Sequence, residues 1–245
     1  SDKHPPSVFV STHLPINDTA AIIQEIARVQ TQSKDVPVEG LIVHIDTTSE
    51  FPALQTLAQT LVGAIPLIIV EDNRNNDDEL PPAQPDCVPI AWHPSVGFSA
   101  EAPLARFLAL CDQAGHHPVI SLPAKDLTDS ITTLLECSPN PPIISLSPTE
   151  NFHTVAGYRV LAASLSNKQL YLPLWIRNRE KDRLLPNADY FSARILDASV
   201  LSGSLLCDGI GDLISVENMD SLNRNRGLAY NLLQGSRTRI SKTEF

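Results

Sequence analysis

The sequence predicts a single α/β domain folded as a (β/α)8 barrel, a TIM-barrel-like fold. Eight short runs rich in β-branched residues alternate in strict order with longer stretches of helical period along the 245 residues. Runs such as 67–70 and 143–144 are continuously apolar, as strands buried on both faces of a parallel sheet are. No low-complexity tract or shift of composition marks an internal boundary. A doubly wound open sheet is the alternative arrangement for the same alternation.

The first half of the chain contains four of the predicted strands, at residues 7–12, 40–46, 66–71 and 88–92. A helix over 18–32 follows the first, because Ile22, Ile26 and Val29 fall on one face behind a capping Asn or Asp. Helices are also expected at 50–62 and 102–114. Residues 72–86 are rich in Asn, Asp and Pro without apolar period, so a long loop is expected to replace the third helix.

The second half continues the alternation, with strands predicted at 118–122, 142–147, 170–176 and 213–217 and helices at 125–136, 153–165, 189–206 and 220–234. Residues 177–183 interleave basic and acidic side chains, which is typical of a solvated loop. Trp92 and Trp175 lie near strand ends, and we expect them in the core rather than as platforms for a ligand.

Composition excludes some partners. The formal net charge is -10 and the sequence pI about 5.1, so no basic stripe is available to neutralise phosphates. We therefore expect neither nucleic acid nor an anionic membrane as a partner. No run of eighteen apolar residues occurs, and 42% of the residues are apolar, enough to form a core without disulfides or metal.

The methionine and cysteine positions suggest the origin of the chain. Its only methionine is Met219, so we expect the chain to be a piece excised from a longer protein. The four cysteines, Cys87, Cys111, Cys137 and Cys207, lie at least twenty residues apart without a C-x-x-C pair. We interpret them as small buried hydrophobes in a reducing cytoplasm rather than as ligands.

Barrel enzymes hold their chemistry at the carboxyl ends of the strands, and several polar residues occupy those positions. They are His13, Asp46, Glu71, Asp72, His93, Lys125, Ser147, Arg177 and Glu217. Imidazole and carboxylate together could ligate zinc or manganese. Because the mouth of any barrel is polar, we expect no metal site. Four carboxylates at the mouth also disfavour a phosphorylated ligand by charge repulsion.

Two stretches near the end of the chain, residues 203–212 and 228–245, have sequences specific enough to indicate a protein family. The second reads L-A-Y-N-L-L-Q-G-S-R-T-R-I-S-K-T-E-F. It resembles the large, three-domain form of 4-hydroxy-3-methylbut-2-enyl diphosphate synthase, an iron-sulfur oxidoreductase of the methylerythritol phosphate pathway of isoprene biosynthesis. In that family a similar sequence motif directly precedes the cysteine motif of the cluster domain. The resemblance implies an inserted middle domain, with residues 1–234 as the barrel and 235–245 as a linker toward an absent [4Fe-4S] domain whose cysteines are expected beyond Phe245.

The resemblance also bears on a glycine-rich turn. The catalytic barrel of the family carries G-I-G-D-T-[IL]-R-V-S, whose arginine and serine are associated with the substrate diphosphate. The matching phrase here keeps Gly209, Gly211 and Asp212, but Ser215 stands at the arginine position and Glu217 at the serine position. A fixed cation is lost and an anion is gained, which works against diphosphate binding. We therefore expect a degenerate duplicate of the catalytic barrel, without catalytic residues, cofactor or metal of its own.

By the same resemblance, the parent protein reductively opens a cyclic methylerythritol diphosphate with electrons from ferredoxin or flavodoxin, in the bacterial cytoplasm or the plastid stroma. We expect this domain to be a catalytically silent spacer that orients the catalytic barrel and the [4Fe-4S] domain, its neighbours in the same chain. Two alternatives stay open. One is a ligand or regulatory site at the barrel mouth centred on His13, Asp46 and His93, and the other is an electron-donor docking patch at 177–183.

Overall fold

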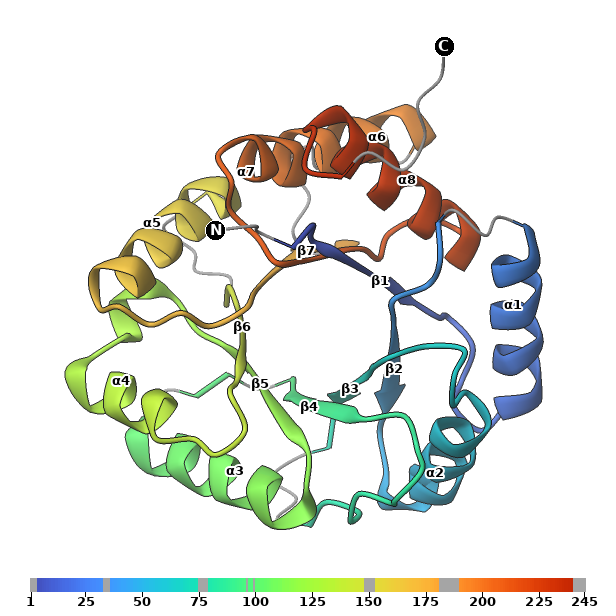
Figure 1. The fold of residues 1–245 in the computed structure, drawn as a ribbon, viewed down its shortest axis with the longest axis horizontal. Coiled ribbons are helices and arrows are strands. Elements are labelled where there is room, and N and C mark those ends of the chain that lie inside the picture. The colour runs from blue at the N-terminus through green and yellow to red at the C-terminus, as the bar shows by residue number, and fades with distance from the viewer. Residues whose placement is uncertain are drawn as a thin grey trace.

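Eight parallel strands form a closed barrel, taken in chain order around its axis (Figure 1). The computed structural model describes residues 4–32, 36–74, 79–95, 97–98, 100–147, 153–180 and 190–239. The last strand pairs in parallel with the first, Val8 lying beside Ile214 and Val10 beside Val216. Because the sheet closes in this way, the (β/α)8 prediction is confirmed and the doubly wound alternative is wrong.

The strands are short, as expected. They are β1 (Ser7–Ser11), β2 (Gly40–Ile45), β3 (Ile68–Asp72), β4 (Ile90–Pro94), β5 (His117–Ser121), β6 (Ile143–Ser145), β7 (Leu174–Asn178) and β8 (Leu213–Val216). The helices that surround them are α1 (Thr19–Gln32), α2 (Phe51–Thr60), α3 (Glu101–Ala114), α4 (Asp129–Glu136), α5 (Thr154–Asn167), α6 (Phe191–Ala198), α7 (Ser204–Cys207) and α8 (Leu222–Gly235). Single turns η1 (Thr48–Glu50) and η2 (Ala124–Asp126) precede α2 and α4.

Two connections agree in outline with the sequence prediction. Among the described residues between β3 and β4, 73–74 and 79–89, no helix occurs, as the Asn- and Pro-rich composition predicted. The helix predicted at 189–206 is a continuous helical segment of α6, a π-helical stretch η4 (Ser199–Gly203) and α7. A π-helical stretch is rare inside a helix and is often found at functional positions.

The seventh strand lies later in the chain than predicted, at Leu174–Asn178 instead of 170–176. Pro173 lacks an N–H donor, and the ladder begins at the next residue, where the Leu174 amide donates to the Asp212 carboxylate at 2.9 Å. This shift places Arg177 inside a strand. The interpretation of 177–183 as a solvated loop is therefore wrong at Arg177, whose side chain is 1% exposed.

The core has two layers separated by the sheet. Inside the barrel lie Phe9, Ile42, Ile69, Ala91, Val119, Ile143, Trp175 and Leu213, while a larger cluster fills the space between strands and helices. Trp92 and Trp175 are both buried, which confirms that they are core residues. Trp92 belongs to the outer layer and Trp175 to the inner one, as the alternation of side chains along strands requires.

Glu39 holds the first and last described segments together at the amino-terminal end of the barrel. Its carboxylate accepts a hydrogen bond from the Val8 amide at 2.8 Å, at the start of β1. The same carboxylate pairs with the Arg239 guanidinium at 2.8 Å, just after α8. The first strand and the segment after the last helix are thus held together by one side chain. No helix of the described part is long and apolar enough to cross a membrane.

The contact between Gly40 and Phe9 allows a stability test. A Cβ at position 40 would lie 1.5 Å from the Phe9 ring inside the barrel. We expect Gly40→Ala to lower the free energy of unfolding by about 1–3 kcal/mol or more, because the interior cannot accept added volume.

Urea denaturation measures this loss, with Gly227→Ala as the matched control. Gly227 lies within α8, where an added Cβ meets nothing within 4 Å. The control should gain about 0.5–1 kcal/mol from helix propensity. Equal effects at the two positions would contradict the packing described for Gly40.

Candidate functional site

Charged and hydroxyl side chains fill the carboxyl end of the barrel. Glu71 comes from β3, His93 from β4, Ser121 from β5, Arg177 from β7, and Ser215 and Glu217 from β8 and its end. We call these six residues the mouth network, because each is hydrogen-bonded to another member. The sequence singled out all of them except Ser121, and the signal that could have found it is its inward position two residues after the buried Val119.

Arg177 is the centre of the mouth network. Its Nε donates to Glu217 Oε1 at 2.8 Å and its Nη2 to Glu217 Oε2 at 2.6 Å, a two-pronged pairing. Its Nη1 donates to the carboxylate of Glu71. The guanidinium lies over the Trp175 ring, with its carbon 4.1 Å from the ring centroid. One buried cation thus joins two carboxylates from distant parts of the sequence.

His93 extends the mouth network toward β5. Its Nδ1 lies 2.6 Å from Glu71 Oε1 and its Nε2 lies 2.8 Å from Ser121 Oγ. A neutral ring with its proton on Nδ1 satisfies both contacts, donating to the carboxylate and accepting from the hydroxyl. Burial lowers the pKa of His93, and the hydrogen bond with Glu71 opposes this shift only in part.

The charge of Glu71 is fixed by its neighbours. Burial by itself would raise the pKa of this carboxyl group, but the Arg177 guanidinium and the hydrogen bond with His93 hold the pKa well below its ordinary value. Glu71 is therefore ionised at neutral pH, and its charge is directed at Arg177 rather than at the solvent.

The two altered positions of the diphosphate-like motif face the same interior. Ser215 Oγ accepts from Trp175 Nε1 at 3.0 Å and donates to Glu217 Oε1 at 2.6 Å. The glycines of the motif lie at the other end of β8, where Gly209 and Gly211 have φ angles of 72° and 107°. Asp212 closes this turn by accepting from the Leu174 amide. The turn therefore serves the helix-to-strand connection.

Other predicted site residues lie outside the mouth network. His13 is exposed, with its Nε2 3.0 Å from the Met219 carbonyl oxygen, and Asp46 is exposed and accepts from Asn73. Asp72 faces the helices, where it pairs with Arg74 at 2.7 Å and accepts from Trp92 Nε1 at 2.7 Å. These three side chains are thus bonded to partners other than His93.

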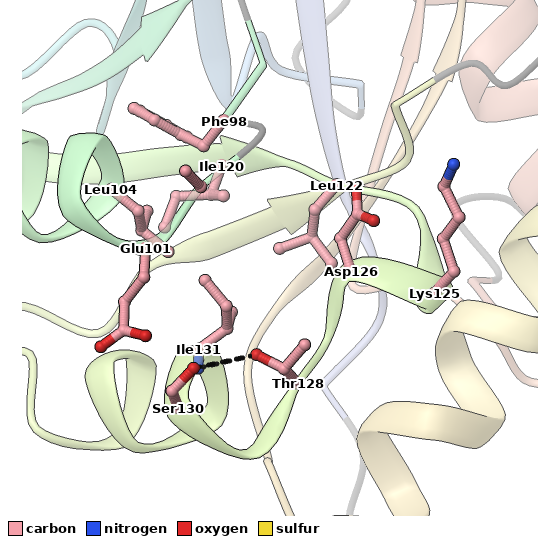
Figure 2. A pocket seen from close by; sticks show the side chains of 11 residues that line it. Phe98, Glu101, Leu104, Ile120, Leu122, Lys125, Asp126, Thr128, Ser130 and Ile131 are labelled. Atoms are coloured by element: carbon pink, nitrogen blue, oxygen red, sulfur yellow. Dashed lines mark hydrogen bonds between the residues drawn. The ribbon is translucent and has the colours of Figure 1, made fainter.

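Two small hollows receive the remaining candidates. One of about 190 Å³ lies beside His93, and Ser147 contributes to its lining together with His44 and Arg179. The other, of about 290 Å³, lies between α3 and α4 and has Lys125 at its edge. Figure 2 shows the Lys125 side chain extending away from the apolar residues of that hollow.

The cysteines are the natural candidates for ligands of a metal. Among the described residues, however, no group of three His, Cys, Asp or Glu side chains is arranged to hold a metal ion. Cys111 is buried, and burial raises the pKa of its thiol to about 12, which disfavours the thiolate that a metal needs. Cys137 and Cys207 are exposed, so the expectation that all four are buried is wrong for these two.

Two curated relatives that align with this chain carry the same protein name. No protein-family model matches the chain. The whole chain aligns at 25% identity over 251 residues with the 4-hydroxy-3-methylbut-2-en-1-yl diphosphate synthase (flavodoxin) of Leptospira interrogans, covering 35% of that protein. The synthase of the same name from Chlorobaculum tepidum is 37% identical over 87 residues, which is 36% of this chain and 11% of that protein. The chain therefore spans about a third of the relative that it matches throughout.

A solved structure supports the fold alone. The HPPK-DHPS protein of Plasmodium falciparum superposes with a TM-score of 0.54 at 12% sequence identity, over 95% of this chain and 46% of that one. The curated relatives carry the name of the family that residues 228–245 resemble.

Removal of the Arg177 cation should lower the stability of the folded barrel. We expect Arg177→Met to lower the free energy of unfolding by about 3–5 kcal/mol, because it leaves two buried carboxylates without their partner. Chemical denaturation of Arg177→Met and of the triple variant Arg177→Met/Glu71→Gln/Glu217→Gln measures this. Most of the stability should return in the triple variant, and a triple variant as unstable as the single one would contradict the pairing.

Two buried histidines predict a pH dependence. Like His93, His116 is buried, with its Nε2 2.7 Å from the Pro81 carbonyl oxygen, and burial lowers its pKa from the ordinary 6.5. The folded protein therefore keeps both rings neutral at pH values where the unfolded chain binds protons. Stability should fall as the pH drops from about 7.5 to 5.5, at up to about 1.4 kcal/mol per pH unit for each ring.

Urea unfolding at the two pH values checks this expectation. His116→Gln should reduce the difference in stability between them, whereas His153→Gln, on an exposed residue, should leave it unchanged. A wild-type protein that is equally stable or more stable at the lower pH would show that the buried rings take up protons in the folded state.

Proposed function

We propose that this chain is the middle barrel of a three-domain 4-hydroxy-3-methylbut-2-enyl diphosphate synthase, and that it acts there as a catalytically silent structural spacer. The observation that carries the proposal is the mouth network, in which the buried Arg177 is paired with Glu71 and Glu217. The alignment of this whole chain with about a third of the Leptospira synthase supports the choice of parent.

The mouth network opposes diphosphate binding for a simple electrostatic reason. An anionic ligand is held by donors and cations that are free to turn toward it. Here all three nitrogens of the Arg177 guanidinium donate to carboxylates of the same barrel. A diphosphate at this end would have to separate those pairs and then lie beside two carboxylates in a poorly solvated place.

The position of the chain ends supports a spacer inserted between domains. Because Glu39 binds both the Val8 amide in β1 and Arg239 after α8, the first strand and the last described residues meet at the same end of the barrel. Ends that lie close together are what domain insertion requires. A closed barrel is then a rigid body to which the preceding and the following domain are both attached.

The redox chemistry belongs to the proposed parent. That protein would carry out the reductive ring opening of methylerythritol cyclodiphosphate with electrons from flavodoxin or ferredoxin. The described cysteines of this chain do not fit a [4Fe-4S] cluster, since no suitable group of ligands gathers around any of them. The cluster ligands are therefore assigned to another part of the parent, and no step through the cluster is assigned here.

The structure favours the spacer over an electron-donor docking patch at 177–183. Arg177, the first cation of that segment, is buried in the mouth network and cannot contribute to a surface patch. Residues 181–183 of the segment lie outside the described residues.

Replacement of the barrel in the full-length parent tests the spacer role. A flexible linker long enough to join the positions of residues 4 and 239 should lower turnover at least tenfold, because proximity without orientation loses most of the advantage of assembled domains. Turnover with a chemical reductant and the visible absorbance of the cluster are measured together. Cluster content should stay unchanged.

The matched control is the full-length parent carrying Arg177→Met/Glu71→Gln/Glu217→Gln. It should keep wild-type turnover, because the proposal gives the mouth network no chemical role. Full activity of the linker variant would overturn the spacer role. A folded but inactive triple variant would instead favour a ligand site at the barrel mouth.

A further inference from the structure

One side of the barrel exposes an unusual number of large apolar side chains. Of the large hydrophobic residues that are exposed in the described part of the chain, four come from residues 190–200: Tyr190, Phe191, Leu196 and Val200. Leu196, Val200 and Cys207 are exposed and Gly203 is half-buried, whereas the leucines at 201, 205 and 206 are buried, which places the first four on one side of the α6–η4–α7 segment. We call this side, with Phe191, the α6 face.

Charge on the α6 face is confined to its edges, where the Arg224 guanidinium carbon lies 5.4 Å from the centroid of the Phe191 ring and Asp208 follows Cys207. The segment from α6 to α7 contains only two charged residues, Arg194 and Asp197. Arg194 donates to the Asn218 carbonyl oxygen at 2.6 Å, and Asp197 is buried. Apart from these edges, the exposed side chains of the segment are apolar, as they often are on the interaction surfaces of soluble domains.

Gly203 adds to this picture because the barrel itself does not require a glycine there. A Cβ at this position would meet nothing within 4 Å. A glycine leaves this point of the segment without a side chain, so a partner can approach the helix backbone closely here. It lies at the end of η4, where the helix is locally widened.

The neighbouring helix α5 continues the surface. It packs against η4 and α7, and Figure 1 shows α5 and α7 next to each other on the rim of the barrel. Val160 on α5 is exposed. The ion pair between Arg159 Nε and Asp208 Oδ2, at 2.8 Å, ties α5 to the end of α7. The apolar surface is therefore carried by two helices that are held together.

We propose that the α6 face is the docking surface for another domain of the same parent chain. The proposal rests on the spacer function, and it names the side of the barrel through which the spacer acts. The relative that matches this chain throughout has about two thirds of its length outside the match, since the chain covers 35% of it. A domain of that size is available to cover the face.

Tethering favours this occupant over a separate molecule. The other domains of the proposed parent are joined to this barrel by the chain itself, which gives them an effective concentration of about the millimolar range. A few exposed apolar side chains are then sufficient for docking. A second copy would need about 800 Å² on each partner and would bring together two chains that each carry -10.

The cysteines of this chain provide a test in the native full-length parent. Cys207 lies on the α6 face, Cys137 is exposed elsewhere, at the end of α4, and Cys111 is buried. Brief reaction with N-ethylmaleimide, followed by peptide mass spectrometry, measures each rate. We expect Cys207 to react at least tenfold more slowly than Cys137, with Cys111 unreactive as a sign that the barrel is folded.

Variants of the α6 face then identify the cause of the protection. Leu196→Glu/Val200→Glu should raise the Cys207 rate to that of Cys137, while Val62→Glu/Tyr171→Glu, on exposed apolar residues outside the α6 face, should leave it low. Leu196 and Val62 are both 52% exposed, which makes the comparison matched. If the first variant makes Cys111 reactive, Leu196→Gln/Val200→Gln replaces it.

Several results would overturn the proposal. Equal rates at Cys207 and Cys137 in the wild-type parent would show that nothing covers the face, and protection that survives in the Gln variant would show that it has a local cause. Protection that depends on protein concentration would assign the face to a second copy, and protection that appears only with added flavodoxin would assign it to the donor. If the linker replacement leaves turnover intact while Cys207 of the wild-type parent is protected, the docking stands and the spacer function falls.

Discussion

The pairing of Arg177 with Glu71 and Glu217 is the interaction on which the carboxyl end of the barrel depends. Arg177 lies 106 positions after Glu71 and 40 positions before Glu217 in the sequence, so the pairing joins β3 to β7 and to the end of β8. A buried charge is tolerated only where its partners are held in good geometry, so the strands must keep their register for the network to form. The apolar layer beneath it, with Trp175 under the guanidinium, supplies that rigidity.

The order of strands and helices could be predicted because it follows from the local spacing of apolar residues. The mouth network could be predicted only as a set of strand ends, since the partners of Arg177 are distant in the sequence. A charged residue followed by Arg179, Lys181 and Arg183 has the local pattern of a solvated loop. Only the later bounds of β7, which begins after Pro173 and ends at Asn178, place Arg177 inside the strand and on the same face as Trp175.

The same reasoning explains why His13, Asp46 and His93 could not be separated by sequence. All three follow or end predicted strands, and the sequence does not say which way each side chain turns. His93 faces the interior as a residue of β4, whereas His13 and Asp46 lie in loops and bond to Met219 and Asn73. Ser215 and Glu217 were more informative because they stand two positions apart at the end of one strand, which commits both to the same face.

Polarity is distributed in a way that suits a rigid connector better than a catalyst. A barrel that binds an anionic substrate at its mouth needs preorganised donors that point at the position of the developing charge. Here Arg177, His93 and Ser215 already have their partners inside the barrel. The α6 face, in contrast, leaves large apolar side chains uncovered on the outside, along α6 and η4. Paired side chains in the mouth network and exposed apolar side chains on the outside therefore both support the proposed spacer over a ligand site at the mouth.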